Sequence, residues 1–153
     1  MRRARSTTSK PKLGHSLKLL FDAAMAARAR AYAPYSRFPV GAALRSREGA
    51  VFAGCNVENA SYPLVTCAEA GAIAAMIAAG HKGIAEFLVF GGGEKVVTPC
   101  GACRQRLREF AGPEVLVHCM SPSGGRVTYS VGALLPAAFG PEHLAQEELA
   151  QEE

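Results

Sequence analysis

The sequence has 153 residues, of which 49% are hydrophobic and 20% are charged, as expected for a single globular domain of ordinary composition. Its net charge of +4 is uneven, because five basic residues among the first 14 positions contribute +5 and the rest of the chain carries −1. A near-neutral domain argues against a nucleic-acid partner, and no apolar run is long enough for a membrane span.

The five cysteines favour a reducing compartment. Their number is odd, and the basic start of the chain is followed by the polar stretch 6–12 instead of an apolar signal segment. We therefore expect a cytoplasmic protein whose thiols serve metal or redox chemistry. We also expect residues 1–14 to form a basic, disordered tail and residues 142–153 to form a polar C-terminal tail.

The first third of the chain predicts a helix followed by a β-hairpin. Apolar residues recur at helical spacing after Ser16, a candidate N-cap, and Pro34 is expected to end this helix. Two short apolar stretches, 40–44 and 50–57, flank a charged turn that ends in Gly49. This arrangement is typical of two antiparallel strands joined by a tight turn.

The rest of the chain alternates helices with strands. The expected elements are a helix over 66–79 ended by Gly80, a strand over 86–90, a helix over 100–110, strands over 115–120 and 127–131, and a short helical stretch around 134–135. This order implies one sheet covered by helices, with antiparallel pairing at the hairpin, in a single domain over 15–141. The glycine run 91–93 lacks the Lys-Ser/Thr of a phosphate-binding loop, so we do not interpret it as a phosphate site.

Three cysteines and one carboxylate form the candidate catalytic motif. Cys67 lies two residues before Glu69, and Cys100 and Cys103 follow Pro99 in a Pro-Cys-x-x-Cys sequence. Three thiolate ligands leave the fourth position of a tetrahedral Zn²⁺ open for water, which is typical of catalytic zinc. A Cys or His two residues before Glu, followed by Pro-Cys-x-x-Cys, is the pattern of zinc-dependent nucleobase deaminases. The sequence therefore predicts one Zn²⁺ per chain, held by Cys67, Cys100 and Cys103.

The other polar groups of the motif suggest how the reaction would proceed. We expect Glu69 to take a proton from an attacking water, deliver it to a ring nitrogen and help protonate the departing ammonia. Three thiolates and Zn²⁺ sum to −1, a charge that the N-termini of the two helices and a nearby cation would offset. Arg104, directly after Cys103, is the best-placed cation, whereas Arg106 and Arg108 are expected at the surface.

Three other interpretations compete with the deamination of an ordinary nucleoside. The first is a non-catalytic zinc module with Cys55 or Cys119 as fourth ligand, although we expect these two thiols to be small buried residues. The second is a deaminase of a cytosine-bearing antibiotic nucleoside. The third, a nucleic-acid-editing deaminase, is disfavoured because the domain lacks a basic, aromatic-rich stretch.

Four motifs within residues 35–140 resemble the small homotetrameric zinc-dependent cytidine deaminases. They are Tyr-Ser-Arg-Phe-Pro-Val-Gly-Ala-Ala-Leu at 35–44, Cys-Asn-Val-Glu-Asn-Ala-Ser-Tyr at 55–62, Cys-Ala-Glu at 67–69 and Pro-Cys-Gly-Ala-Cys-Arg-Gln at 99–105. The resemblance implies a three-layer α/β/α sandwich around a mixed sheet. It also implies hydrolysis of cytidine and deoxycytidine to uridine and deoxyuridine in pyrimidine salvage, by a homotetramer in which neighbouring subunits complete each site.

Further residue roles follow from the resemblance alone. It implies that Asn56 and Glu58 hold the ribose hydroxyls. It implies that Phe38 packs on the pyrimidine ring and that Phe139 reaches the site of a neighbouring subunit. The family often has Arg directly after Cys-Ala-Glu, where this chain has Ala70. We therefore expect a working site with altered zinc electrostatics, which an A70R variant would test through the acid limb of the pH–rate profile.

Overall fold

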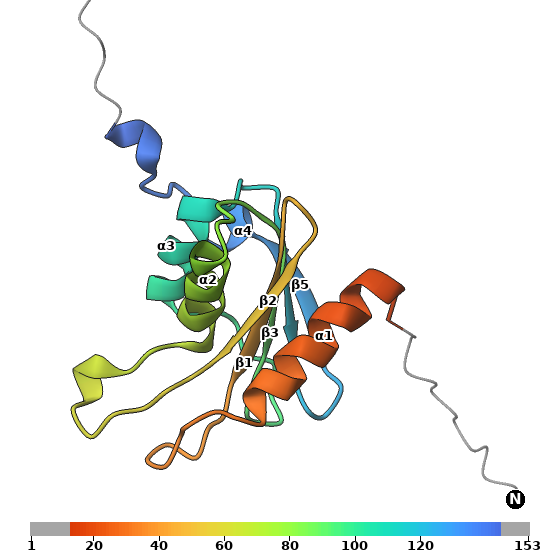
Figure 1. The fold of residues 1–153 in the computed structure, drawn as a ribbon, viewed down its shortest axis with the longest axis vertical. Helices are drawn as coiled ribbons and strands as arrows, with labels where there is room; N and C mark the ends of the chain where they lie inside the picture. The colour runs from red at the N-terminus through yellow and green to blue at the C-terminus, as the bar shows by residue number, and fades with distance from the viewer. Residues whose placement is uncertain (1–12, 145–153) are drawn as a thin grey trace, which may run out of the picture.

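The computed structural model describes residues 13–144, which form a five-stranded sheet with helices on both faces (Figure 1). In chain order the elements are α1 (His15–Arg28), β1 (Gly41–Ser46), β2 (Val51–Cys55), the 3-10 helix η1 (Tyr62–Leu64), α2 (Ala68–Ala78), β3 (Ile84–Phe90), α3 (Gly101–Phe110), β4 (Leu116–Met120), β5 (Arg126–Ser130), α4 (Val131–Leu134) and the 3-10 helix η2 (Pro141–His143). The order of α-helices and strands is the predicted one. The expectations for residues 1–12 and 145–153 lie outside the described residues.

The sheet is mixed, with the strand order β2-β1-β3-β4-β5. Strand β1 pairs antiparallel with β2 and β3, and β4 pairs antiparallel with β5, whereas β3 runs parallel to β4. The parallel pair needs a long crossover, which α3 provides, while the hairpin needs only the tight turn in which Gly49 has a φ of +92°. The predicted hairpin and the mixed pairing are confirmed.

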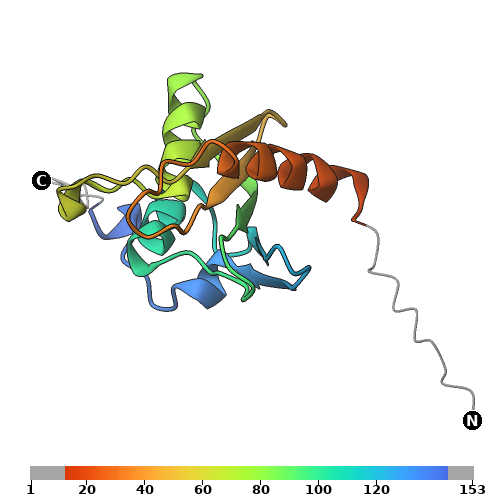
Figure 2. The same ribbon diagram turned by 90° about the horizontal axis from the view of Figure 1, so that it is seen from below.

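Helices cover the sheet on both sides, which confirms the three-layer α/β/α arrangement. Helix α1 lies on one face, and α2 and α3 lie on the other (Figures 1 and 2). Side chains that alternate along each strand therefore enter two separate hydrophobic cores. In β3, for example, Leu88 packs in the core under α1, while its neighbour Val89 packs in the core under α2 and α3.

Two glycines let the helices approach the sheet at backbone distance. A Cβ atom at Gly54 of β2 would lie 2.6 Å from the carbonyl oxygen of Ala68 in α2. A Cβ atom at Gly41 of β1 would lie 2.8 Å from Cβ of Arg28 in α1. Both distances are too short for real Cβ contacts, so any larger residue would push the helix away. Because α2 begins at the predicted zinc motif, the contact at Gly54 sets the position of that motif.

The start of α1 differs from the prediction. Its N-cap is Gly14, and Ser16 lies inside the first turn. The Ser16 hydroxyl instead donates a hydrogen bond to Oε2 of Glu86 on β3, at 3.3 Å. Serine often caps helices, but here the Ser16 hydroxyl makes a tertiary contact with the sheet instead.

The end of α1 also differs, because the helix ends at Arg28 and does not continue toward Pro34. By Tyr32 the chain is already extended, since the Tyr32 amide donates to the carbonyl of Asn56 at 3.0 Å and Tyr32 bridges to Val57. Pairing with the segment after β2 therefore overrides the alanine-rich helical pattern. The boundaries of α2, α3 and the strands lie within two residues of the prediction.

Two loops, 29–40 and 56–67, project from the same end of the sandwich (Figures 1 and 2). They are joined along their length, for example by the Glu58 amide, which donates to the carbonyl of Tyr32 at 2.8 Å. The second loop exposes Tyr62 and Leu64 to solvent. Within residues 13–144, no helix has both the length and the hydrophobicity needed to traverse a bilayer.

Candidate active site

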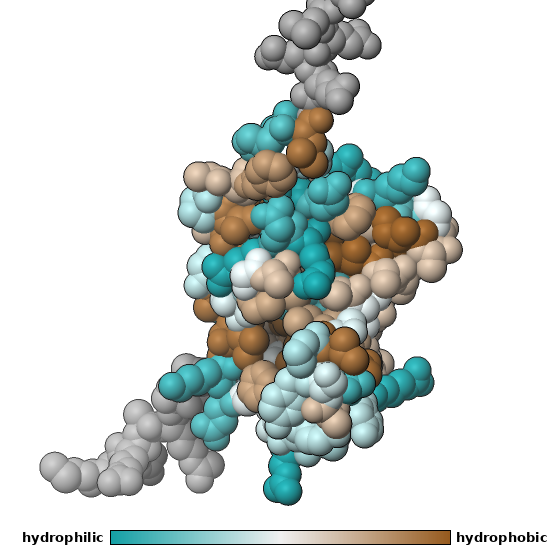
Figure 3. Space-filling view, turned by 90° about the vertical axis from the view of Figure 1, so that its left-hand side faces the viewer, coloured by the Kyte–Doolittle hydropathy of each residue, from teal (hydrophilic) through white to brown (hydrophobic). Residues whose placement is uncertain are grey.

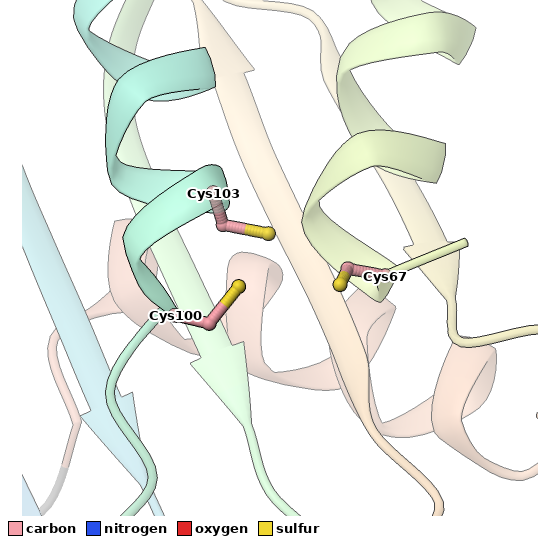
Figure 4. Close-up of side chains that lie close together, drawn as sticks. All are labelled: Cys67, Cys100 and Cys103. Atoms are coloured by element: carbon pink, nitrogen blue, oxygen red, sulfur yellow. The ribbon is translucent and has the colours of Figure 1, made fainter. Parts of the chain in front are cut away.

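Three cysteine sulfurs converge where α2 and α3 begin (Figure 4). Cys67 is the N-cap of α2, Cys100 is the N-cap of α3, and Cys103 lies in the first turn of α3. Their Sγ atoms all lie within 4.8 Å of one another. The fold thus brings together the three thiols that the sequence predicts to share a metal ion.

Local backbone geometry and close packing explain this convergence. As N-caps, Cys67 and Cys100 have extended backbone angles, with ψ values of 153° and 169°, so each precedes its helix. Cys103 follows three residues later and shares a helix face with Cys100. Helix α2 is held on the sheet by small residues, because a Cβ atom at its Gly71 would lie 3.4 Å from Cα of Gly54.

The donor set fits a zinc ion. Sulfur atoms at two corners of a tetrahedral zinc site lie about 3.8 Å apart when each Zn–S bond is about 2.3 Å. The three Sγ atoms lie within 4.8 Å of one another, close enough to share one ion. Among residues 13–144, this is the one group of three or more Cys, His, Asp or Glu side chains close enough to hold a metal. Cys55 and Cys119 are free thiols outside the group. Three ligands leave a position for water, which argues against a closed four-thiolate site.

The three thiols differ in their affinity for protons. Burial raises the pKa of Cys67 and of Cys103, and the nearby charge of Glu69 raises both further. Burial also opposes ionisation of Cys100, but hydrogen bonds from the Cys103 amide and from the other two thiols lower its pKa. Cys100 is therefore the thiol that ionises first in the metal-free cluster. A bound divalent cation deprotonates thiols that coordinate it.

Glu69 is the buried acid beside this cluster, with 5% of its surface exposed. Burial raises the pKa of its carboxyl above the usual value. Hydrogen bonds from its own amide and from the Cys103 thiol, together with the charge of Arg106, oppose this rise. A carboxyl whose pKa is raised holds a proton more readily and can both accept and return one. Glu69 therefore has the environment of an acid–base group.

Arg104 is bound to backbone and hydroxyl oxygens. Its Nε donates to the carbonyl of Pro99 at 2.8 Å, Nη1 to the carbonyl of Leu134 at 3.0 Å, and Nη2 to the hydroxyl of Thr98 at 3.1 Å. These bonds fix the segment before Cys100 against the end of α4. The guanidinium thus anchors the loop that carries a predicted ligand, a role that the sequence did not indicate. Arg106 is exposed, as predicted.

Asn56 closes the end of loop 29–40 with both atoms of its amide. Nδ2 donates to the carbonyl of Phe38 at 2.9 Å, and Oδ1 accepts from the amide of Val40 at 2.8 Å. The Asn56 amide nitrogen of the main chain also donates to the carbonyl of Val40 at 3.2 Å. Phe38 is thereby held by its backbone while its ring stays partly exposed.

Glu58 binds the preceding part of the same loop and borders a cavity. Its carboxylate accepts from the amides of Tyr35 and Ser36, at 2.8 and 3.2 Å. Hydrogen bonds from Ser36 and from these amides lower the pKa of Glu58 and keep it ionised. The adjoining cavity has a volume of about 300 Å³, at the lower end for small-molecule sites. It is lined by Tyr35, Ser36, Glu58, Asn59, Tyr62 and Val65.

Phe139 lies apart from these groups, on the segment after α4, and is 55% exposed. Its carbonyl accepts from Nε2 of Gln105 in α3 at 2.9 Å, and its ring stacks on His143 with centroids 5.0 Å apart. The backbone is fixed to the helix that carries Cys103, while the ring faces outward. Within one chain, Phe139 is not among the residues that line the cavity beside Glu58.

The sequence analysis missed the residues that hold these groups in place. Tyr35, Ser36 and Gln105 lie within the quoted motifs, but no role was predicted for the amides of the first two or for the side-chain amide of the third. The close contact at Gly54 was not predicted either. A glycine inside a predicted strand is the one signal that was available, because such residues mark close backbone approach.

Comparisons with known proteins agree with this geometry. Residues 15–119 match the family model described as the cytidine and deoxycytidylate deaminase zinc-binding region. A cytidine deaminase of Sporosarcina psychrophila is 40% identical over 119 residues, which are 78% of this chain and 88% of the relative. The crystal structure of cytidine deaminase from Burkholderia pseudomallei matches with a TM-score of 0.77 and 46% identity, over 83% of this chain and all of that one. That of Mycobacterium tuberculosis matches with a TM-score of 0.71 and 42% identity, over 81% and 97% of the two chains.

Proposed function

Because this chain belongs to the family of cytidine and deoxycytidylate deaminases with a zinc-binding region, we infer that it hydrolyses cytidine and deoxycytidine to uridine and deoxyuridine, with release of ammonia. The observation that carries this inference is the cluster of three thiols with the buried carboxyl of Glu69 beside it. Such a reaction returns cytosine nucleosides to the uridine pool, which is the chemistry of pyrimidine salvage.

We propose that Cys67, Cys100 and Cys103 hold one Zn²⁺ and that Glu69 moves the protons. Zinc supplies Lewis acidity that lowers the pKa of water at its open position. Glu69 takes a proton as the water oxygen bonds to the ring carbon that bears the amine, and gives it to the adjacent ring nitrogen. Glu69 then transfers the second proton of that water to the amine, so the carbon–nitrogen bond breaks and ammonia leaves. Arg104 acts by fixing the ligand loop and by adding one positive charge near three thiolates.

We propose that Asn56 and Glu58 hold the ribose and that Phe38 packs on the pyrimidine. The Glu58 carboxylate has about four acceptor positions, and two loop amides use part of them. The Asn56 amide likewise keeps one hydrogen and one lone pair after its two loop contacts. The remaining capacity suits sugar hydroxyls, which donate and accept. The partly exposed ring of Phe38 suits stacking on a planar base.

We propose that the enzyme is a homotetramer in which Phe139 enters the site of a neighbouring subunit. The exposed ring of Phe139 supports this, as do Tyr62 and Leu64, of which 71% and 66% are exposed. On the face that Figure 3 shows, hydrophobic areas lie between hydrophilic ones as several separate patches. Burial of such patches between subunits would stabilise an assembly.

We further propose that the catalytic domain spans residues 15–141 and works in the cytoplasm. Helix α1 begins at His15, which supports the first limit, whereas η2 (Pro141–His143) extends two residues past the second. All five cysteines are free thiols, which suits a reducing compartment.

The function is tested by the loss of cytidine absorbance on incubation with purified, zinc-loaded protein. The parent is expected to turn over cytidine and deoxycytidine, and E69Q is expected to lose activity by about 10²-fold or more because the proton carrier is missing. E109Q, a substitution of an exposed glutamate on α3, serves as the matched control. An inactive parent with one zinc bound, or turnover of cytosine-bearing antibiotic nucleosides alone, would overturn the assigned substrate.

The assembly is tested by mixing two inactive variants. F139A would lack the ring that enters the site of a neighbouring subunit, and E69Q would lack the proton carrier of its own site. If sites are shared, mixed tetramers regain sites in which both residues are intact, so activity rises after subunit exchange. Light scattering gives the subunit number independently. A monomer of full activity would contradict the proposal.

A further inference from the structure

Arg28, the last residue of α1, connects three segments that the sequence separates widely. Its Nε donates to the carbonyl of Pro39 at 3.1 Å, and its Nη2 donates to the carbonyl of Gly92 at 3.4 Å. Its guanidinium carbon lies 5.3 Å from the centre of the Phe90 ring, so the cation also rests on an aromatic face. One side chain thus holds the end of loop 29–40 and the glycine run after β3.

Along the chain, the carbonyl of Pro39 lies between the carbonyl of Phe38 and the amide of Val40, and Asn56 binds both of these neighbours. The Asn56 side chain binds the carbonyl of Phe38 on one side and the amide of Val40 on the other, at 2.9 and 2.8 Å. Arg28 binds the carbonyl between them. Three consecutive backbone groups are therefore fixed by two side chains from different elements. Both side chains therefore hold the backbone on the C-terminal side of Phe38, which carries the Phe38 ring.

The glycine run packs directly against this turn. A Cβ atom at Gly92 would lie 2.7 Å from the carbonyl oxygen of Pro39, which is the oxygen that Arg28 also binds. A Cβ atom at Gly93 would lie 3.3 Å from Cε2 of Phe38. The glycines are therefore needed for close approach to Phe38 and Pro39. Two carbonyl oxygens converge on one guanidinium, whose positive charge offsets the repulsion between their dipoles.

We propose that Arg28 is a positioning residue for the nucleoside, acting through Pro39 on Phe38 and Asn56. This inference rests on the proposed deamination of cytidine, because it assumes that Phe38 meets the base and Asn56 the ribose. Arg28 itself touches neither. Contacts to base and sugar are made in the ground state and in the transition state alike, so weakening them raises KM and leaves kcat nearly unchanged.

Two substitutions of Arg28 separate positioning from stability. R28M keeps an aliphatic stem over Phe90 but donates to neither carbonyl, and R28K reaches one carbonyl at a time. For R28M we expect a rise in KM for cytidine of about 10- to 100-fold, the loss that one or two hydrogen bonds to a charged group produce. R28K is expected to lie between R28M and the parent. G92A, which pushes on the Pro39 carbonyl from the other side, is expected to raise KM in the same way.

The controls are R30M, at an exposed position two residues along the chain, and G14A, where a Cβ atom meets nothing within 4 Å. Both are expected to keep the parental KM. Zinc content is measured in every variant and is expected to stay at one per chain. Amide hydrogen exchange gives a readout without turnover: the Val40 amide should exchange faster in R28M, while the amides of β3 and β4 keep their protection.

The role of Arg28 is overturned if R28M and R28K keep the parental KM, if their losses fall on kcat alone, or if R30M raises KM equally. It is also overturned if exchange rises equally across the sheet, because Arg28 would then be a general stability element. A parent that binds zinc and leaves cytidine unchanged would instead overturn the proposed function, so the two failures are distinguishable.

Discussion

The contact between Gly54 and α2 allows a sharp test of how the fold builds the site. In G54A, the new Cβ atom would lie 2.6 Å from the carbonyl oxygen of Ala68 and from the carbonyl carbon of Gly71, and closer still to the amide nitrogen of Ala72. Ordinary contact begins at 3.4 Å, so α2 must move away from the sheet by at least 0.8 Å. All three contacts are helix backbone, which cannot turn aside as a flexible side chain can.

The displacement bears directly on the zinc site because Cys67 and Glu69 travel with α2, while Cys100 and Cys103 stay with α3. Metal sites tolerate deviations of about 0.2 Å in ligand distance, and a misplacement of about 1 Å costs about 10²-fold in rate. We therefore expect G54A to lose about 10²-fold in kcat and to bind zinc more weakly. Overpacking of this kind should also lower the free energy of unfolding by about 1–3 kcal/mol.

The assay combines three measurements on G54A, the parent and G14A. Zinc retention is followed by titration with a chromophoric chelator, kcat by cytidine absorbance, and stability by urea denaturation. Gly14 has a φ of −60° and nothing within 4 Å of a new Cβ atom, so G14A meets no steric obstacle and should cost no more than about 1 kcal/mol, the usual cost of alanine at an N-cap. A G54A protein with parental zinc affinity and kcat would show that the glycine contact does not set the position of α2.

Three further predictions test the ligand set, the role of the metal and the pH dependence of stability. C119A and C55A should keep one zinc per chain by atomic absorption, because Cys119 and Cys55 lie outside the cluster, whereas C103A should lose its zinc. Loss of zinc in C119A would indicate a fourth thiolate ligand. A chelator should abolish turnover and lower the melting temperature, and added Zn²⁺ should restore both, since a ligand that binds only the native state stabilises it. Burial lowers the pKa of His118, whose ring contacts Glu86 at 3.0 Å. The unfolded chain therefore binds its proton more readily, and stability should fall as the pH drops below the ordinary value of about 6.5. Urea midpoints at pH 7.5 and 5.5 should show a smaller pH effect in H118Q, and equal slopes in the two proteins would contradict this.

The element order could be predicted from the sequence because most elements carry a complete local signal. Helix α3 has its N-terminal Pro-Cys start and ends before Gly112-Pro113, and the hairpin has two apolar strands around a glycine-ended turn. For helix α1 the local stop signal is Pro34, and the alanines continue to Ala31, so the local pattern extends past the observed end of the helix. Only the pairing of Tyr32 with the segment after β2 ends it at Arg28.

In the candidate site, the chemical groups could be predicted from the sequence, whereas the residues that position them could not. Cys67, Glu69, Cys100 and Cys103 were predicted from residue type and spacing, because zinc chemistry needs those groups and helix geometry places Cys100 and Cys103 on one face. The residues that position them act over long sequence separations. Gly54 meets α2 across a packed interface, and Arg104 binds the carbonyl of Leu134, 30 residues away.

The family, the order of the elements and the cysteines of the candidate site could all be predicted, since each depends on residue types at short, fixed spacing. Only the folded chain shows that Asn56 and Glu58 hold loop 29–40, that Arg104 anchors the segment before Cys100 and that Arg28 joins Pro39 to Gly92. These bonds go to backbone carbonyls and amides. Every residue has a backbone carbonyl and every residue except proline has an amide N–H, so no side-chain pattern marks the partners until the chain has folded.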